Sequence, residues 1–270
     1  MDDKAKESAV TRGFKPFNRL KKCRHGAFVY NENDSHVGRS LHEYGEFAEG
    51  EVELFRRLIN AGQVIVDVGA GTGVHSVIMA RLTGPDGAVL AFEPQRLLFQ
   101  TLCANIAINS LTNVYARNVV VGLEGGRIKV PTLDPTRRIN FGAFSVKGHA
   151  RGEPVGMLTI DALELARCEL IRIDVGEMAR DVVVGGEVTI KRFKPVLYVN
   201  VAGLDGGREL GKMITQFGYR LYWHRPPLFN ARNPENNKED IFNEATSMNM
   251  LCVTGAAPEG IHGLEEVVLR

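Results

Sequence analysis

The sequence predicts an α/β fold, a Rossmann-like doubly wound sheet with helices on both of its faces. The apolar run 64–68 turns abruptly into a glycine-rich stretch, as a buried parallel strand does before a helix. A second run, 88–92, ends in Glu93 and Pro94, and proline stops a strand and opens a helix. Strand-like and helix-like segments then alternate, which is the pattern of βαβ units in a largely parallel sheet.

Composition limits the classes of partner. At 270 residues the chain can bury one large α/β core. Its net charge of +1 provides no general attraction to nucleic acid or to acidic membranes, so neither is predicted as a partner. The chain has no run of about 18 uncharged apolar residues and no apolar leader at its N-terminus, so we expect a cytoplasmic protein without a membrane span. Four scattered cysteines and the lack of clustered His, Asp or Glu predict metal independence.

Three parts are expected along the chain. Residues 1–60 form an N-terminal arm, a hairpin cap and a leading helix, residues 61–256 form the main domain, and residues 257–270 form a C-terminal tail. The segment 11–25 carries several basic side chains and no acid. We interpret it as a solvated arm, and a docking strip for an anionic substrate carrier is the alternative.

The elements follow in order from hydrophobic periodicity and from glycine and proline stops. Ahead of the main domain, a hairpin or cap is expected over 26–44 and a helix over 49–60. Strands are expected at 64–68, 88–92, 114–121, 170–175, 194–201, 219–223 and 247–254, and helices at 74–82, 95–109, 178–192 and 207–217. The segment 122–156 is rich in glycine and proline, and we expect an inserted hairpin or lid with β-like runs at 127–130 and 141–146.

The glycine turn after the first strand predicts a nucleoside pocket. Its glycines are Gly69, Gly71 and Gly73, whereas a dinucleotide fingerprint needs a further glycine where Val74 stands. Asp67 adds negative charge near the turn, which suits the cationic amino-acid end of S-adenosylmethionine better than a pyrophosphate. Glu93, at the tip of the second strand, is placed to accept hydrogen bonds from a ribose diol. S-adenosylmethionine is therefore the predicted cofactor, and an NAD-type oxidoreductase is the disfavoured alternative.

Other polar residues near the predicted sheet edge are weaker candidates. Asp174 ends the strand 170–175 and is either a general base or a carboxylate that caps a helix or orients the cofactor. His75 follows the glycines, where packing or capping is the more usual role. His224 is expected to line the acceptor side. Tyr44 and Glu46 either close over the cofactor or are ordinary surface residues.

With these residues laid out, the chain resembles the FkbM-type family of class I S-adenosylmethionine-dependent methyltransferases over roughly residues 26–255. Each matching stretch is weak alone, but the set is specific in this order and spacing. The stretches are VIVDVGAGTG, AFEPQ, the helix end with Asn105 and Asn109, NFGAFS, LTID, LIRIDV, KPVLYV and SMNMLC.

The resemblance implies a seven-stranded sheet of order 3-2-1-4-5-7-6 with strand seven antiparallel. It implies methyl transfer to a hydroxyl on a sugar, a polyketide or another small acceptor. Carried onto this chain, it places Asp67 and the three glycines at the methionine end of the cofactor and Glu93 at the ribose. It also places Asn118 at the adenine edge, and a buried structural asparagine is the alternative there.

The chain departs from the family after the fourth and fifth strands. Family members usually have D-V-E-G-M-E after the fourth strand, whereas this chain has DVGEMA, so the acid Glu177 is shifted by one residue. A shift of one residue on a helix rotates a side chain by about 100°. Asp174 is therefore the first candidate for the general base and Glu177 the second. After the fifth strand the family tends to have acidic residues, whereas this chain has Asn200, Val201 and Ala202. Because these acids are missing, a non-catalytic S-adenosylmethionine-binding module is an alternative.

Overall fold

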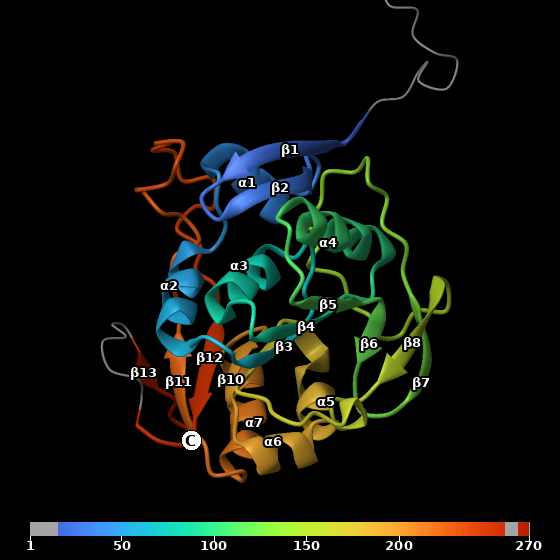
Figure 1. The fold of residues 1–270 in the computed structure, drawn as a ribbon, viewed down its shortest axis with the longest axis vertical. Helices are drawn as coiled ribbons and strands as arrows, with labels where there is room; N and C mark the ends of the chain where they lie inside the picture. Colours follow the sequence, from blue (N-terminus) through green and yellow to red (C-terminus); the bar gives the residue numbers. More distant parts are fainter. Residues whose placement is uncertain (1–15, 257–263, 270) are drawn as a thin grey trace, which may run out of the picture.

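A mixed sheet of eight strands runs through the centre of the protein (Figure 1). The computed structural model describes residues 16–256 and 264–269. In spatial order the strands are β13 (Glu265–Glu266), β11 (Arg220–His224), β12 (Asn249–Val253), β10 (Val196–Asn200), β9 (Leu170–Ile173), β3 (Val64–Val68), β4 (Ala88–Phe92) and β5 (Val114–Arg117). Strands β10, β9, β3, β4 and β5 are parallel, and β12 is antiparallel to both β10 and β11.

The predicted α/β class is confirmed, but the predicted count of seven strands is wrong. Strand β13 extends the sheet by pairing antiparallel with β11. It lies within residues 257–270, which the sequence predicts to be a C-terminal tail. Of these, 257–263 and 270 lie outside the described residues. Two paired residues are too short a run for a periodic pattern to reveal.

Helices cover both faces of the sheet (Figure 1). One face carries α2 (Glu49–Leu58), α3 (Val74–Thr83) and α4 (Arg96–Ile108), and the other carries α5 (Ala179–Val184), α6 (Glu187–Phe193) and α7 (Leu204–Thr215). Adjacent strand residues point to opposite faces. Accordingly Ile65 packs in a cluster with Phe55 and Met79, and Val66 packs in the cluster that contains Val182. All four residues of β9 are buried, as expected for a central parallel strand.

The single helix predicted over 178–192 is instead a 3₁₀ turn, η2 (Gly176–Met178), followed by the two short helices α5 and α6. The break falls at Gly185 and Gly186. A Cβ on Gly185 would lie 2.1 Å from the carbonyl oxygen of Gly122, so this glycine permits a close backbone approach. The low helix propensity of paired glycines allows the chain to break here.

The strand predicted over 114–121 divides at Asn118. Strand β5 stays in the main sheet, while β6 (Val119–Val121) joins a second sheet of order β6-β8-β7, with β7 (Gly126–Val130) and β8 (Glu153–Leu158). Strand β7 covers the predicted run 127–130, but its antiparallel partner is β8 and not the run 141–146. No strand forms over the β-like run 141–146, which is part of a loop that crosses to the N-terminal cap, where Ser35 N–H donates to the Ile139 carbonyl (2.9 Å). A further 3₁₀ turn, η1 (Asp161–Leu163), follows β8.

The N-terminal cap is a hairpin followed by a helix. Strands β1 (Asn18–Cys23) and β2 (Gly26–Asn31) pair antiparallel, and α1 (Val37–Tyr44) follows. The segment predicted as a solvated arm is mostly exposed in β1, as expected, but it is a strand paired with β2, and residues 11–15 lie outside the described part. Basic side chains of this segment pair with acids of the chain, Arg19 with Glu32 (2.8 Å) and Lys21 with Glu235 (2.9 Å), which weakens the docking-strip alternative.

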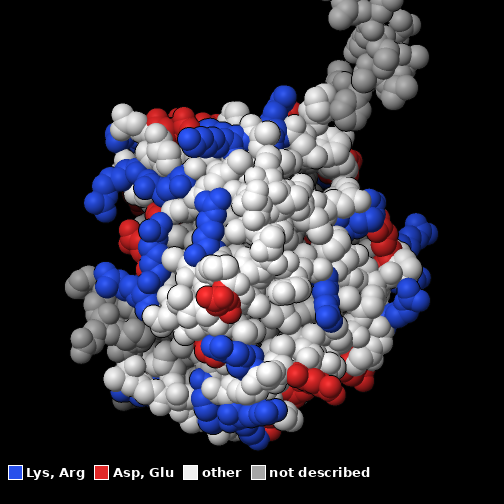
Figure 2. Space-filling view, in the orientation of Figure 1, with Lys and Arg blue, Asp and Glu red and all other residues white. Residues whose placement is uncertain are grey.

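Charged side chains of both signs lie around the edge of the face drawn in Figure 2, and its centre is mostly uncharged. Within residues 16–256 and 264–269, every helix is too short or too polar to cross a bilayer.

Candidate functional site

The three predicted glycines form the turn between β3 and α3, and each has a positive φ. Their neighbours differ. A Cβ on Gly69 would lie 2.1 Å from the Asp174 carbonyl oxygen, and one on Gly73 would lie 2.4 Å from Leu102 Cδ1. Gly71, with φ of 57°, would meet no atom of the described residues within 4 Å. Gly69 and Gly73 thus permit close packing, whereas Gly71 borders open space that a ligand can enter.

Glu93 faces this turn. It follows β4, which pairs with β3, and it is only 4% exposed. Its Oε2 accepts a hydrogen bond from Gly71 N–H (2.8 Å), and its Oε1 accepts one from Gln95 N–H (2.8 Å). Burial raises the pKa of Glu93 to about 7, and the charges of Asp174 and Asp67 add to the shift. The carboxylate therefore lies at the turn with hydrogen-bonding capacity left on both oxygens.

Asp67 lies beneath the turn and is fully buried. Its Oδ1 accepts from Arg172 Nη1 (2.9 Å) and its Oδ2 from the Ser76 hydroxyl (2.6 Å). The sheet register places Asp67 directly opposite Arg172. Burial opposes the charge of Arg172, but the carboxylates of Asp67, Asp174 and Glu51 together raise its pKa. Asp67 thus takes part in a buried ion pair.

Asp174 is the exposed member of this cluster. Arg172 Nη2 donates to its Oδ2 (2.6 Å), its backbone N–H donates to the Val68 carbonyl (2.8 Å), and its side chain is 41% exposed. Within the described residues, its Oδ1 has no hydrogen-bond partner. Asp174 therefore presents a fixed carboxylate oxygen beside Gly69.

The other two predicted residues, Glu177 and Asn118, each form hydrogen bonds within the chain. Glu177, in η2, is exposed and accepts a hydrogen bond from the Ser145 hydroxyl of the inserted segment. The acids that raise the pKa of Glu93 include Asp174 and Asp67 but not Glu177. Asn118 Nδ2 donates to the carbonyls of Glu93 (2.8 Å) and Pro94 (2.9 Å), which fixes the chain after β4 and explains why β5 ends there.

Sequence reasoning missed Arg172 and a polar chain beside it. Asn200 Nδ2 donates to Asn249 Oδ1 (3.2 Å), and Asn249 Nδ2 donates to Glu51 Oε1 (3.1 Å). Glu51 is buried, and burial raises its pKa. In the sequence, the arginine inside the apolar run LIRIDV indicates this cluster, because a buried arginine requires acidic partners.

The two histidines and the cap residues have structural partners. His75 is buried against Phe55 (ring centroids 5.6 Å apart), and burial lowers its pKa well below the ordinary value, so its packing role is favoured. The Tyr44 hydroxyl donates to the Glu239 carbonyl (2.7 Å), and Glu46 accepts from Asn230 Nδ2 (2.8 Å). Both contacts join the cap to the loop 225–244. His224 lines a separate cavity, described below.

The site suits a ligand that carries positive charge and a diol. Four carboxylates, those of Glu51, Asp67, Glu93 and Asp174, lie within electrostatic reach of Arg172 or of one another. Arg172 is a single positive charge among these acids, so the site has an excess of negative charge. The open space at Gly71 adjoins Glu93. Both features fit the sulfonium and ribose of S-adenosylmethionine. In the described part of the chain, no three His, Cys, Asp or Glu side chains are grouped to hold a metal ion.

The profile of the Methyltransferase FkbM domain family matches residues 67–221, more than half of the chain. No curated protein matches the chain. Among solved structures it is similar to methyltransferase FkbM from Methylobacillus flagellatus KT, with 14% identity, 74% of this chain and 50% of that one covered, and a TM-score of 0.49. The chain thus spans about half the length of that protein.

Two further solved structures are also similar to the chain. Precorrin-6y C5,15-methyltransferase from Geobacter metallireducens GS-15 has 14% identity, with 76% of this chain and 87% of that one covered and a TM-score of 0.47. The O-methyltransferase TomG from Streptomyces achromogenes, solved with S-adenosylmethionine, has 16% identity, with 76% and 79% covered and a TM-score of 0.46.

Proposed function

Because the chain belongs to the FkbM methyltransferase family, we propose that it transfers a methyl group from S-adenosylmethionine to a hydroxyl of a small acceptor such as a sugar or a polyketide. The observation that carries the proposal is the buried Glu93 carboxylate, bonded to Gly71 N–H at the edge of open space. Ligands of open α/β sheets bind at this carboxyl edge of the strands.

The cofactor would be held along the turn. Glu93 accepts hydrogen bonds from the ribose diol, because its oxygens keep acceptor sites beyond the bonds from the N–H groups of Gly71 and Gln95. Gly71 keeps a side chain out of the space for the methionine end, Gly69 and Gly73 let the turn pack closely beside it, and Asp67 adds its charge from below. Asn118 has both hydrogens of its amide engaged, so its free carbonyl oxygen is the atom that would accept from the adenine amino group.

Bound S-adenosylmethionine supplies an electrophilic methyl group on a sulfonium, whose departure leaves a neutral thioether. The chain must hold the acceptor oxygen in line with that methyl, and such positioning contributes up to about 7 to 11 kcal/mol. It must also remove the hydroxyl proton. Asp174 Oδ1 takes this role, since Arg172 fixes the carboxylate and leaves that oxygen free. Glu177 is the second candidate, and its carboxylate is engaged by Ser145.

Acceptor-dependent release of S-adenosylhomocysteine tests the proposal, with a labelled methyl group followed into the product. We expect an O-methyl product from one or more hydroxylated acceptors. Asp174→Asn should lower kcat by about 10²- to 10⁴-fold while binding of S-adenosylhomocysteine stays close to that of the wild type. Glu177→Gln is the matched control and should change kcat far less. A methyl group found only on nitrogen or carbon would contradict the proposal.

A further inference from the structure

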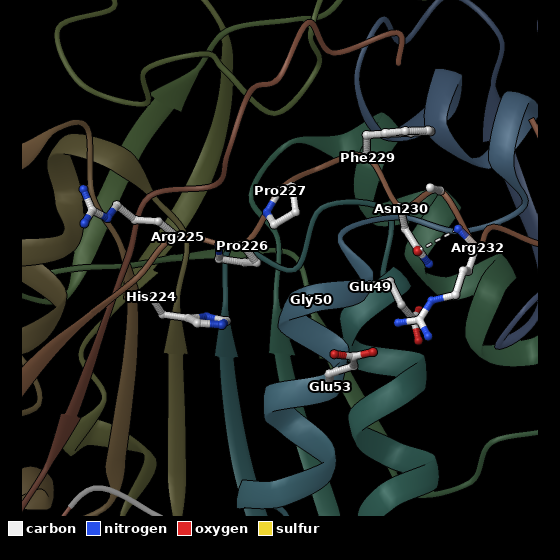
Figure 3. Close-up of a pocket in the computed structure, with 11 residues that line it drawn as sticks. Glu49, Gly50, Glu53, His224, Arg225, Pro226, Pro227, Phe229, Asn230 and Arg232 are labelled. Carbon is white, nitrogen blue, oxygen red and sulfur yellow. Dashed lines mark hydrogen bonds between the residues drawn. The ribbon is translucent and has the colours of Figure 1, made fainter. Parts of the chain in front are cut away.

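A cavity of about 400 Å³ lies at the end of β11 (Figure 3), and no residue of the glycine turn lines it. Its walls are the first turns of α2 and the segment 225–232. Glu49 and Glu53 of α2 line it, whereas Glu51, between them, bonds to Asn249 on the inner side of the helix. The first turn of α2 thus contributes residues to this cavity and one acid, Glu51, to the polar chain near Arg172.

His224 offers the cavity a fixed polar atom. Its ring comes from the end of β11 and points toward α2 (Figure 3), and the residue is 8% exposed. Its Nδ1 is hydrogen-bonded to the Tyr198 hydroxyl (2.8 Å), while its Nε2 has no partner among residues 16–256 and 264–269. Burial lowers the pKa of His224 to about 4, so the ring is neutral near pH 7. Nε2 thus has one hydrogen bond to give or to accept.

The free charges that face the cavity are of opposite sign. In the described structure neither the Glu53 carboxylate nor the Arg232 guanidinium forms a side-chain hydrogen bond or an ion pair. The other charged residues of the lining are paired, Glu49 with His25 (2.6 Å) and Arg225 with Glu265 (2.5 Å). Arg225 also points away from the other drawn residues (Figure 3). The negative charge of Glu53 and the positive charge of Arg232 cancel, so the net charge of the cavity favours a neutral ligand over an ion.

Apolar surfaces complete the lining. Pro226, Pro227 and Phe229 provide them, and the Phe229 ring packs on Tyr44 with centroids 5.4 Å apart. A carboxylate only accepts hydrogen bonds and a guanidinium only donates them, so a ligand that satisfies both must do both. Hydroxyl groups have this property, and a pyranose ring adds an apolar CH face. The volume lies within the range of about 300 to 1,000 Å³ that is usual for small-molecule pockets.

We propose that this cavity is a binding site for a neutral saccharide, with Glu53, Arg232 and Nε2 of His224 binding its hydroxyls and Phe229 contacting a ring face. The site is one for recognition and involves no bond making. Its lining includes none of the residues assigned to the cofactor or to the general base, so it can be tested apart from methyl transfer.

Saturation-transfer NMR and titration of the full chain test the site, with the methyl glycosides of glucose, galactose, mannose, rhamnose and N-acetylglucosamine as probes at about 10 mM, enough to reveal millimolar affinity. At least one glycoside should bind. Glu53→Gln and Arg232→Gln should each weaken that binding about tenfold or more, because hydrogen bonds to charged groups are lost. Both residues are exposed, so the variants should fold.

Glu124→Gln, the same chemical change on the turn between β6 and β7, is the control and should leave glycoside binding unchanged. Titration of Glu53→Gln with S-adenosylhomocysteine should match the wild type, which separates this site from the cofactor site. The proposal is overturned if none of the glycosides binds, or if binding is equally strong in both pocket variants. Binding of glucuronate or glucose 6-phosphate in preference to every neutral glycoside would also overturn it.

Discussion

Glu93 and Asp67 lie on neighbouring strands and are both buried, but they differ in what balances their charge. Asp67 has a guanidinium on one oxygen and a hydroxyl on the other. Among the residues that the structure describes, Glu93 has two backbone N–H groups as partners and no cation, and burial raises its pKa to about 7. A carboxylate that is buried without a cation, next to open space, is a candidate for ligand binding. The two acids of the motif therefore differ in surroundings, since Asp67 takes part in a buried ion pair whereas Glu93 is the acid that we propose binds the ligand.

Removing the cation should have the largest effect. Arg172→Leu leaves Asp67 buried without its cation, so the free energy of unfolding should fall by about 3 to 5 kcal/mol. Urea unfolding followed by circular dichroism measures it. Arg167→Leu is the control, because the Arg167–Glu169 pair is largely exposed and should contribute less than about 1 kcal/mol. A similar small loss for both variants would show that Arg172 does not balance Asp67.

Glu93 should make stability depend on pH in a specific direction. Its pKa is 4.5 in its ordinary state and about 7 in the fold, so between these values the folded chain binds more protons than the unfolded one. Its contribution is present below about pH 4.5 and is lost as the pH rises through about 7, a change on the order of 3 kcal/mol.

Glu93→Gln removes this titration. The free energy of unfolding, measured from about pH 5 to about pH 8, should therefore decline less steeply in the variant than in the wild type. Glu124→Gln should keep the wild-type slope. Identical slopes in all three proteins would mean that Glu93 is not an uncompensated buried acid.

The smallest effect is expected at the second partner of Asp67. Ser76→Ala removes a hydroxyl that donates to a buried carboxylate, so the free energy of unfolding should fall by about 1 to 2 kcal/mol. Thr101→Ala, which removes a hydroxyl bonded to a helix carbonyl, should cost less. If Ser76→Ala also weakens binding of S-adenosylhomocysteine as much as loss of Glu93 does, the proposed difference between Asp67 and Glu93 fails.

The sequence predicts the glycine turn and Glu93 well because their signals are local. A strand, a turn and a helix follow one another in a single stretch, and parallel pairing then brings the end of β4 to the turn. The role of Arg172 is not local. It lies 105 positions from Asp67, and only the register of β3 with β9 sets them opposite each other.

Other misses have the same physical origin. Asn118 interrupts a run of β-formers because its side chain binds carbonyls after β4, a contact that no periodicity shows. The surroundings of His224 show the same limit, since the cavity it lines is completed by Glu49 and Glu53, far away in sequence. Local patterns predict the elements and the turn, whereas long-range packing decides which polar groups meet.

Calorimetric titration with S-adenosylhomocysteine, on the wild type and on Glu93→Ala, tests the central claim most directly. If Glu93 binds the ribose, the variant should lose about 1.5 to 3 kcal/mol of binding free energy, a rise in Kd of about 10- to 150-fold. Glu124→Ala should bind like the wild type. Equal affinity in a folded Glu93→Ala protein, or no binding to the wild type, would contradict the account.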